Sequence, residues 1–229
     1  MSSFYEVDKK CEEIVSKWVE ENIFNQPKFN GEYIRNENEE LQKSGADLFL
    51  KSDEIFEDNE EYVIDEKCAT SYIKTDVRES NIPTFAFELD YEGKSGKRND
   101  GWLYGSQFKD TDYYLLYWLW ANVERRSDKL GKKEQVSKDN ILKVKAFLIE
   151  KKKVQEYLVH FKITPSNYRR ASHRLRNEME ENKVYINKNK NRKTPNVQYN
   201  AYLKEKPVTV IISENDLRNM AIKCWEVEV

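Results

Sequence analysis

The chain has 229 residues, of which 38% are hydrophobic, 13% aromatic and 35% charged. This length and aromatic content are enough for one sizeable α/β domain with a packed core. The charge content argues against a membrane protein, as does the lack of any apolar run near the ~20 residues that a spanning helix needs.

The cysteines and the start of the chain indicate a cellular compartment. The opening MSSFYEVDKKCEEIV is acidic and lacks the basic start and apolar middle of a signal peptide. Cys11, Cys68 and Cys224 are far apart and odd in number, which favours reduced thiols over a disulfide framework or a zinc site. These features predict a cytoplasmic protein.

Charge is distributed unevenly behind a net charge of -2. Residues 1–100 contain 13 Lys and Arg against 25 Asp and Glu, whereas the remainder contains 26 against 16. A basic half could track phosphates and an acidic half could hold metal ions. Solvated faces without a function explain the asymmetry equally well.

The first 150 residues predict a helix followed mainly by strands. Apolar side chains recur at helical spacing over 8–22, and a short helix is expected at 35–43. Strands are expected at 46–51, 61–69, 84–89 and 140–149, with a charged turn at 52–60 and a flexible loop at 92–101. The aromatic segment 113–123 is a buried strand or a buried helix, because periodicity alone does not separate the two.

The last third of the chain predicts a helical hairpin and more strands. Helices are expected at 152–161 and 165–182, then a basic loop at 187–196, a hairpin of 200–206 with 208–213, and a final helix at 214–225. We therefore expect a core of residues 1–150 and a C-terminal helical and β extension of residues 151–229 packed on it.

Three expected strands each carry a charged side chain that could meet the others. Asp47 lies early in the first, and Asp65 and Lys67 share one face of the second because side chains alternate along a strand, so that Glu66 points away. On the third strand, Glu88 could face the same cluster. Acidic groups brought together repel unless a cation neutralises them, and Mg²⁺ prefers such oxygen ligands.

The segments GADLFL, IDEKCA and FAFEL resemble the PD-(D/E)xK phosphodiesterases, the restriction-endonuclease-like superfamily. In that superfamily an Asp begins one strand and an acid-x-Lys follows on the neighbouring strand. Asp47 matches the first motif, although Ala46 replaces the frequent Pro, and the triplet Asp65-Glu66-Lys67 matches the second. The resemblance covers residues 35–125 and implies an α/β fold whose mixed central sheet is flanked by helices.

The resemblance also implies a metal site and its chemistry. Asp47, Asp65 and the backbone carbonyl of Glu66 would coordinate Mg²⁺ or Mn²⁺, and Lys67 would orient or help deprotonate the attacking water. The products would carry a 5′-phosphate and a 3′-hydroxyl. A purely structural interpretation also exists, in which the two Asp side chains cap strand ends and Lys67 is only the ion-pair partner of Asp65.

Members of this superfamily often carry a further acid or Gln on the helix before the first motif. Glu39, Glu40 and Gln42 are the candidates, and which of them faces the site stays open. We assign Gln42 a supporting catalytic role together with Glu88.

The helical hairpin offers a second candidate site, for nucleic acid. The stretch KVQEYLVHFKITPSNYRRASHRLR has the rhythm of a helix-turn-helix, so that Arg169, Arg170 and Arg174 could meet phosphates or guanine edges. Lys190 and Arg192 in the basic loop are further candidates for phosphate contacts. An ordinary helical hairpin with a solvated basic face explains the same pattern.

The sequence thus predicts a metal-dependent endonuclease that hydrolyses DNA phosphodiesters, in restriction, host defence or a mobile element. DNA is preferred over RNA because most of the superfamily cuts DNA. One alternative is a nuclease fold that has lost its chemistry and acts as a nucleic-acid- or protein-binding module, such as an inhibitor. Another is an acidic interaction protein. Paired cuts across a duplex would need a homodimer, which no sequence pattern requires.

Overall fold

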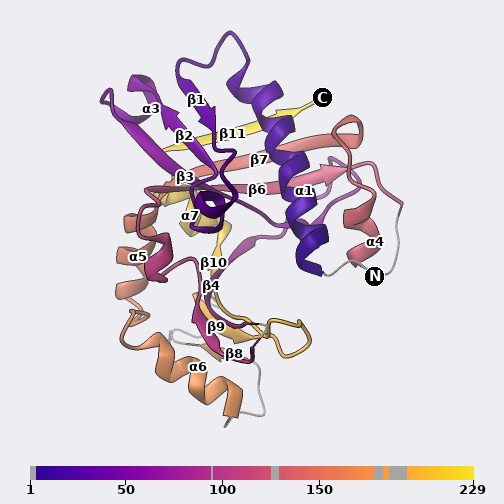
Figure 1. Cartoon of the computed structure of the whole chain (residues 1–229). Helices are drawn as coiled ribbons and strands as arrows, with labels where there is room; N and C mark the ends of the chain where they lie inside the picture. Colours follow the sequence, from indigo (N-terminus) through magenta and orange to yellow (C-terminus); the bar gives the residue numbers. More distant parts are fainter. Residues whose placement is uncertain (1–3, 94, 125–128, 178–182, 186–194) are drawn as a thin grey trace. The chain divides into compact units, whose positions relative to one another are not determined.

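The computed structural model describes residues 4–93, 95–124, 129–177, 183–185 and 195–229, and its contacts divide the chain into two units (Figure 1). The first unit comprises Met1–Pro83, Asp112–Ile149 and Ala221–Val229, and the second comprises Thr84–Thr111 and Glu150–Met220. The expected boundary at residue 150 is therefore wrong in two places. The segment 84–111 belongs with the second unit, and the last nine residues return to the first.

The first unit is built on a six-stranded mixed sheet with the strand order β1-β2-β3-β6-β7-β11. Its strands are β1 (Glu32–Arg35), β2 (Leu48–Lys51), β3 (Glu61–Cys68), β6 (Tyr113–Ala121), β7 (Ile141–Glu150) and β11 (Lys223–Glu228). Its helices are α1 (Phe4–Val19), continued by a π-helical turn (Glu20–Phe24), α2 (Glu39–Lys43), α3 (Asp53–Phe56) and α4 (Lys129–Glu134). Strands β2 and β3 are antiparallel, whereas β3 and β6 are parallel, so the expected α/β class with a mixed sheet is confirmed.

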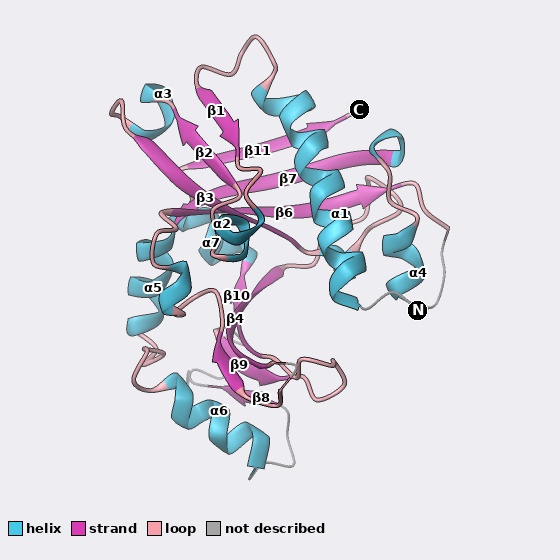
Figure 2. Cartoon of the chain, viewed as in Figure 1, coloured by secondary structure: helices cyan, strands magenta, loops and turns pink. Residues whose placement is uncertain are grey.

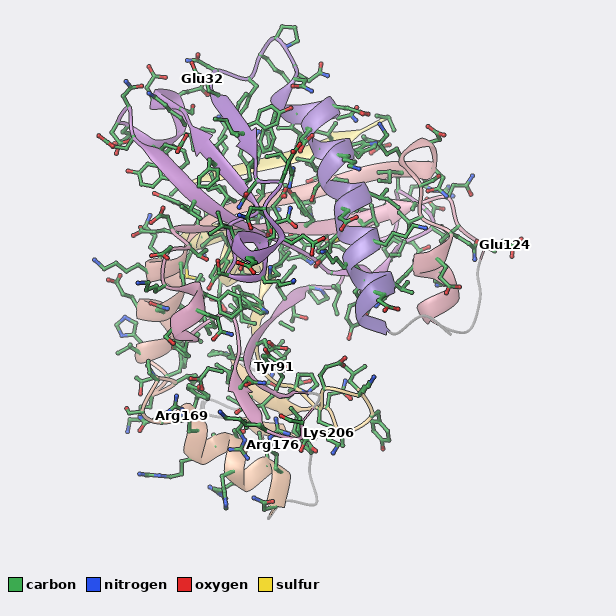
Figure 3. The ribbon with its side chains drawn as sticks, in the orientation of Figure 1. Glu32, Tyr91, Glu124, Arg169, Arg176 and Lys206 are labelled. Carbon is green, nitrogen blue, oxygen red and sulfur yellow. The ribbon has the colours of Figure 1, made fainter. Side chains whose placement is uncertain are left out.

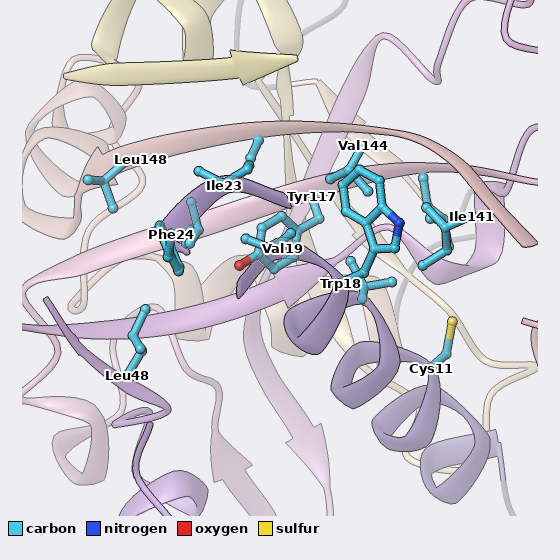
Figure 4. Packing of buried hydrophobic residues seen from close by; sticks show 14 of the residues in the cluster. Cys11, Trp18, Val19, Ile23, Phe24, Leu48, Tyr117, Ile141, Val144 and Leu148 are labelled. Atoms are coloured by element: carbon cyan, nitrogen blue, oxygen red, sulfur yellow. The ribbon is translucent and has the colours of Figure 1, made fainter. Parts of the chain in front are cut away.

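Helix α1 forms where expected because one of its faces is apolar. Cys11, Val15, Trp18 and Val19 are buried and belong to one cluster with side chains of β2, β6 and β7 (Figure 4). That buried stripe follows the helical period and leaves charged residues on the outer face. The cluster fixes the helix against the sheet that carries the candidate site.

The aromatic segment 113–123 contains the strand β6, and its burial explains why the periodicity of its sequence does not distinguish a strand from a helix. Every residue from Tyr114 to Ala121 is buried, so both faces of the strand are covered. Strands that are buried on both faces show no alternation between apolar and polar residues. The neighbouring strand β3 is parallel to it, with Asp65 in register with Tyr114.

The region expected as a helix at 35–43 is divided between a strand and a shorter helix. Residue Arg35 ends β1, which pairs with β2, and α2 begins only at Glu39. Asn38 caps α2, because its side-chain oxygen accepts the N–H groups of Glu40 and Leu41. Five residues of α2 then lead to Gly45, which has a φ of 82°, a conformation that glycine adopts without strain.

The second unit contains a five-stranded sheet with the order β5-β4-β10-β9-β8 (Figure 2). Its strands are β4 (Thr84–Glu92), β5 (Arg98–Asp100), β8 (Lys183–Tyr185), β9 (Asn196–Tyr199) and β10 (Val208–Ser213), and its helices are α5 (Lys151–Val159), α6 (Tyr168–Asn177) and α7 (Glu214–Met220). The pairs β5–β4, β4–β10, β10–β9 and β9–β8 are all antiparallel. The strand expected at 84–89 exists, but it pairs with β5 and β10 and not with β3.

Two C-terminal expectations are corrected. Residues 200–206 do not form the first arm of a hairpin, because β9 at Asn196–Tyr199 is the partner of β10. The final helix ends at Met220, and residues 223–228 form β11 beside β7. In β11, exposure alternates residue by residue, with Trp225 and Val227 packed against the apolar cluster, and this period of two is that of a strand.

None of the helices in the described residues combines the length and the apolar character needed to cross a membrane.

Candidate functional site

Asp47, Asp65 and Lys67 come together where β2 and β3 pair. Asp47 directly precedes β2, its N–H donates to the carbonyl of Ile64 (3.0 Å), and its Oδ2 accepts the N–H of Glu66 at 2.9 Å. Burial raises the pKa of Asp47 well above its ordinary value; the positive charge of Lys67 lowers it, and the negative charges of Asp65 and Glu66 raise it further. Asp47 is thus a half-buried acid whose ionised form is favoured by the positive charge of Lys67.

Lys67 supplies the positive charge within this cluster. Its Nζ donates to Asp65 Oδ1 and, at 3.0 Å, to the carbonyl oxygen of Glu66. Burial alone would lower the pKa of Lys67, but the carboxylates of Asp65, Asp47 and Glu12 raise it above its ordinary value. The Lys67 side chain is 23% exposed, whereas that of Asp65 is 0% exposed. Lysine is therefore the only member of this pair that reaches solvent.

Glu12 is a member of the cluster that sequence reasoning missed. It lies on α1, accepts the N–H of Cys68 at 3.1 Å, and has its pKa raised to about 7, chiefly by burial. Asp8, one turn earlier, has a separate cation, because its Oδ1 accepts from the buried Lys133. Glu12 instead shares Lys67 with the two aspartates. The only signal in the sequence is that Glu12 follows the buried Cys11 and so borders the apolar face of the helix.

The contacts described for the helix before the first motif, α2, do not include the acid cluster. Gln42 donates from Nε2 to the carbonyl of Asn36 at 2.5 Å and so closes its own loop. Glu39 is 74% exposed and lies 3.6 Å from Lys43, and Glu40 is also exposed. The helical acid that interacts with Lys67 is instead Glu12 of α1, and strand β1 lies between α1 and α2 in the sequence.

Glu88 also fails to join the cluster through the sheet. It lies on β4, which belongs to the sheet of the second unit, where it is paired in register with Thr209 of β10. The prediction assumed that three strands consecutive in sequence are neighbours in one sheet. The strand that completes the antiparallel group with β2 and β3 is instead β1.

The side chain of Glu66 points away from Asp65 and Lys67, as the alternation along a strand predicts. Its Oε2 accepts from Arg35 Nη1, and its Oε1 accepts from the hydroxyl of Tyr117. Arg35 also donates from Nε to Glu20 Oε1 at 2.5 Å. These contacts form a network, buried at Glu66 and Tyr117, on the side of β3 opposite to the side chains of Asp65 and Lys67, and they hold the side chain of the middle residue of the triplet.

The oxygens of Asp47, Asp65 and the Glu66 carbonyl are of the hard type that a divalent cation prefers. Asp65 Oδ2 is buried without a hydrogen-bond partner, and Asp47 needs a positive charge nearby to ionise. Within the described residues no group of three or more His, Cys, Asp or Glu side chains is arranged to hold a metal ion. A cation would therefore rest on two carboxylates and the Glu66 carbonyl, and Mg²⁺ is commonly held by one or two carboxylates with water and substrate phosphates.

The second candidate site lies on α6 of the second unit. Tyr168, Ser172 and Leu175 are buried, and Arg170 and Arg174 are exposed. The helix is anchored at both ends by charged contacts. Arg169, 64% exposed, donates to Asp100 Oδ2 at 2.7 Å, and Arg176 forms a buried pair with Asp90 at 2.5 Å (Figure 3). Lys190 and Arg192 lie outside the described residues.

No protein-family model, no curated protein and no solved structure matches this chain. The site is therefore interpreted from its own residues and geometry.

Proposed function

We propose that the chain is a metal-dependent endonuclease that hydrolyses the phosphodiester bonds of DNA. One observation carries this proposal. The half-buried carboxylate of Asp47, just before β2, and the buried carboxylate of Asp65 on β3 lie with Lys67, and Asp65 Oδ2 is buried without a hydrogen-bond partner. A structural ion pair explains Asp65 with Lys67, but it leaves the half-buried second acid, Asp47, and the unpartnered Asp65 oxygen unexplained.

The arrangement of the first unit supports a restriction-endonuclease-like fold. Helix α1 is followed by the antiparallel strands β1, β2 and β3, and then β6 lies parallel to β3 in the same sheet. The Asp that precedes β2 and the acid-x-Lys on β3 occupy neighbouring strands, as the resemblance requires.

The residues of the site divide the chemistry of hydrolysis among them. Asp47, Asp65 and the Glu66 carbonyl hold the cation, and bound Mg²⁺ or Mn²⁺ supplies charge neutralisation on the phosphate and acidity to water. Lys67 adds positive charge as the phosphate becomes more negative in the transition state. Water contributes its oxygen to phosphorus, the P–O3′ bond breaks, and the 3′ oxygen takes up a proton, leaving a 5′-phosphate and a 3′-hydroxyl.

The exposed arginines of α6 supply contacts to the DNA backbone in this proposal. Guanidinium groups pair well with phosphate oxygens, and such contacts bind without reading sequence. Arg170 and Arg174 project from a helix whose opposite side is buried, which holds them in fixed positions.

A cleavage assay tests the proposal. Linear duplex, branched and single-stranded DNA, with matched RNA, are incubated with the protein in Mg²⁺, in Mn²⁺ and in excess chelator. We expect metal-dependent cutting that Asp65→Asn and Lys67→Met abolish. Asp58→Asn and Lys17→Met, which change the same charges at other positions of the first unit, should cut as the wild type does. No cutting by the wild type, with DNA bound equally by all variants, would instead identify a binding module.

A further inference from the structure

The backbone of Glu66 is the point at which the candidate catalytic groups are joined. Its N–H donates to Asp47 Oδ2 at 2.9 Å, and its carbonyl oxygen accepts from Lys67 Nζ at 3.0 Å. The same carbonyl is one of the three oxygens proposed to hold the cation. The N–H and the carbonyl belong to the two successive peptides that meet at Glu66, so the backbone of this residue sets the positions of Asp47, Lys67 and a metal ligand together.

The side chain of Glu66 lies on the opposite face of β3 and fixes the position of this backbone. Both of its carboxylate oxygens are bonded, one to Arg35 and the other to the hydroxyl of Tyr117. The Glu66 side chain is 4% exposed, and Tyr117 is 1% exposed. Charge-assisted hydrogen bonds of this kind are short and directional. The network includes residues of β1, β3 and β6, so it connects the Glu66 backbone to strands on both sides of β3.

Stability alone is a poor explanation for this network. Buried ion pairs pay a desolvation cost, and replacing them with well-packed apolar side chains is often neutral or stabilising. Here the cost is visible, because Arg35 Nη2 is buried without a hydrogen-bond partner. A buried network that fixes geometry has a different use, since catalytic groups must be held within a fraction of an ångström of a productive arrangement.

We propose that Arg35 and Tyr117 are positioning residues of the proposed nuclease, acting through Glu66 on Asp47, Lys67 and the metal-binding carbonyl. The inference rests on the proposed function. Neither residue contacts the acid cluster side of β3, so neither touches substrate or metal. Loss of such outer contacts commonly costs 10–100-fold in metal affinity or activity.

The test compares two tyrosine hydroxyls of the first unit. Tyr117→Phe removes the hydrogen bond to Glu66 Oε1 and keeps the buried ring. Tyr33→Phe is the control, since its hydroxyl donates to Asn25 Oδ1 at 2.8 Å and reaches no part of the triplet in any contact described. Mn²⁺ affinity by titration calorimetry, kcat and KM on cleaved DNA, and the melting temperature are measured for each, at a temperature where both are folded.

A double variant separates positioning from stability. Arg35→Met with Glu66→Met removes both charges of the pair, so Glu66 does not become an unpaired buried charge, while Glu20, which also accepts from Arg35, is 19% exposed.

A positioning role predicts that Tyr117→Phe and the double variant lose about 10–100-fold in Mn²⁺ affinity and in kcat, with KM for DNA unchanged. Tyr33→Phe should match the wild type. The inference is overturned if both test variants keep kcat and Mn²⁺ affinity within about twofold of the wild type while only their melting temperatures fall. If the wild type itself neither binds Mn²⁺ nor cuts DNA, the proposed function fails, and the inference fails with it.

Discussion

The half-buried acid Glu12 makes the stability of the metal-free protein depend on pH in a defined direction. Its pKa is raised from an ordinary value of 4.5 to about 7, first by burial, against the opposing charge of Lys67. The folded protein therefore holds the Glu12 proton more tightly than the unfolded chain does. The contribution of Glu12 to stability is therefore greatest below pH 4.5, falls as the pH rises towards 7, and is lowest above it.

The size of the effect follows from the two pKa values. One pKa unit corresponds to about 1.4 kcal/mol, so complete ionisation of Glu12 costs about 3 kcal/mol of folding free energy. The variant Glu12→Gln keeps an oxygen that can accept the N–H of Cys68 but cannot ionise. Relative to the wild type, it should gain about 3 kcal/mol between pH 4.5 and pH 8.

Urea denaturation in excess chelator at a series of pH values measures this difference. Taking the difference between variant and wild type removes the common contributions of other carboxyl groups. Glu13→Gln is the matched control, because Glu13 is exposed on the same helix, 3.9 Å from Lys9, and its difference should stay flat with pH. If the stability difference for Glu12→Gln is equally independent of pH, the pKa of Glu12 is not raised in the folded protein and the reasoning is refuted.

Three further predictions concern charge. Lys67→Met should raise Mn²⁺ affinity about tenfold in calorimetry while abolishing cleavage, because the ammonium competes for the metal's oxygens; unchanged or weaker affinity contradicts this. Arg176→Met should cost about 3–5 kcal/mol in urea denaturation, because Asp90, 1% exposed, loses its partner; a loss below about 1 kcal/mol would count against it. Arg170→Ala with Arg174→Ala should reduce the slope of log affinity for DNA against log salt by about 2, whereas an unchanged slope would mean a solvated face.

Local sequence patterns predicted the central part of the site. The apolar residues around Asp47 and around the triplet Asp65-Glu66-Lys67 predicted two strands, and the structure makes those strands antiparallel neighbours. Alternation along a strand then placed Asp65 with Lys67 and turned Glu66 away, as the hydrogen bonds show. These features depend on sequence separations of a few residues, which the period of a strand determines.

Pairing between distant segments could not be predicted in the same way. The strand that carries Glu88 was identified correctly, but an alternating pattern does not specify which strand will be its neighbour. Its partner β10 lies more than a hundred residues further along the chain. Residues 223–225 of β11 were expected as the end of a helix, and the partner strand β7 lies more than 70 residues earlier in the chain.

Helix faces set the other limit. Glu12 and Gln42 are both polar residues on helices before β2, and the family resemblance directed attention to the second. Docking of α1 through Cys11 and Val15 brings Glu12 to the end of β3, whereas α2 has no buried residue to dock it. Which polar side chain enters a site is decided by the packing of the apolar face beside it, and that packing is tertiary.

Cleavage with analysis of the product ends tests the central claim most directly. A mixture of labelled duplex, branched and single-stranded DNA is incubated with the wild type and with Asp65→Asn, in Mn²⁺ and in chelator. Hydrolysis at this site predicts cuts by the wild type only, dependent on the metal, with 5′-phosphate and 3′-hydroxyl ends. Intact DNA in every reaction, or equal cutting by both proteins, would contradict it.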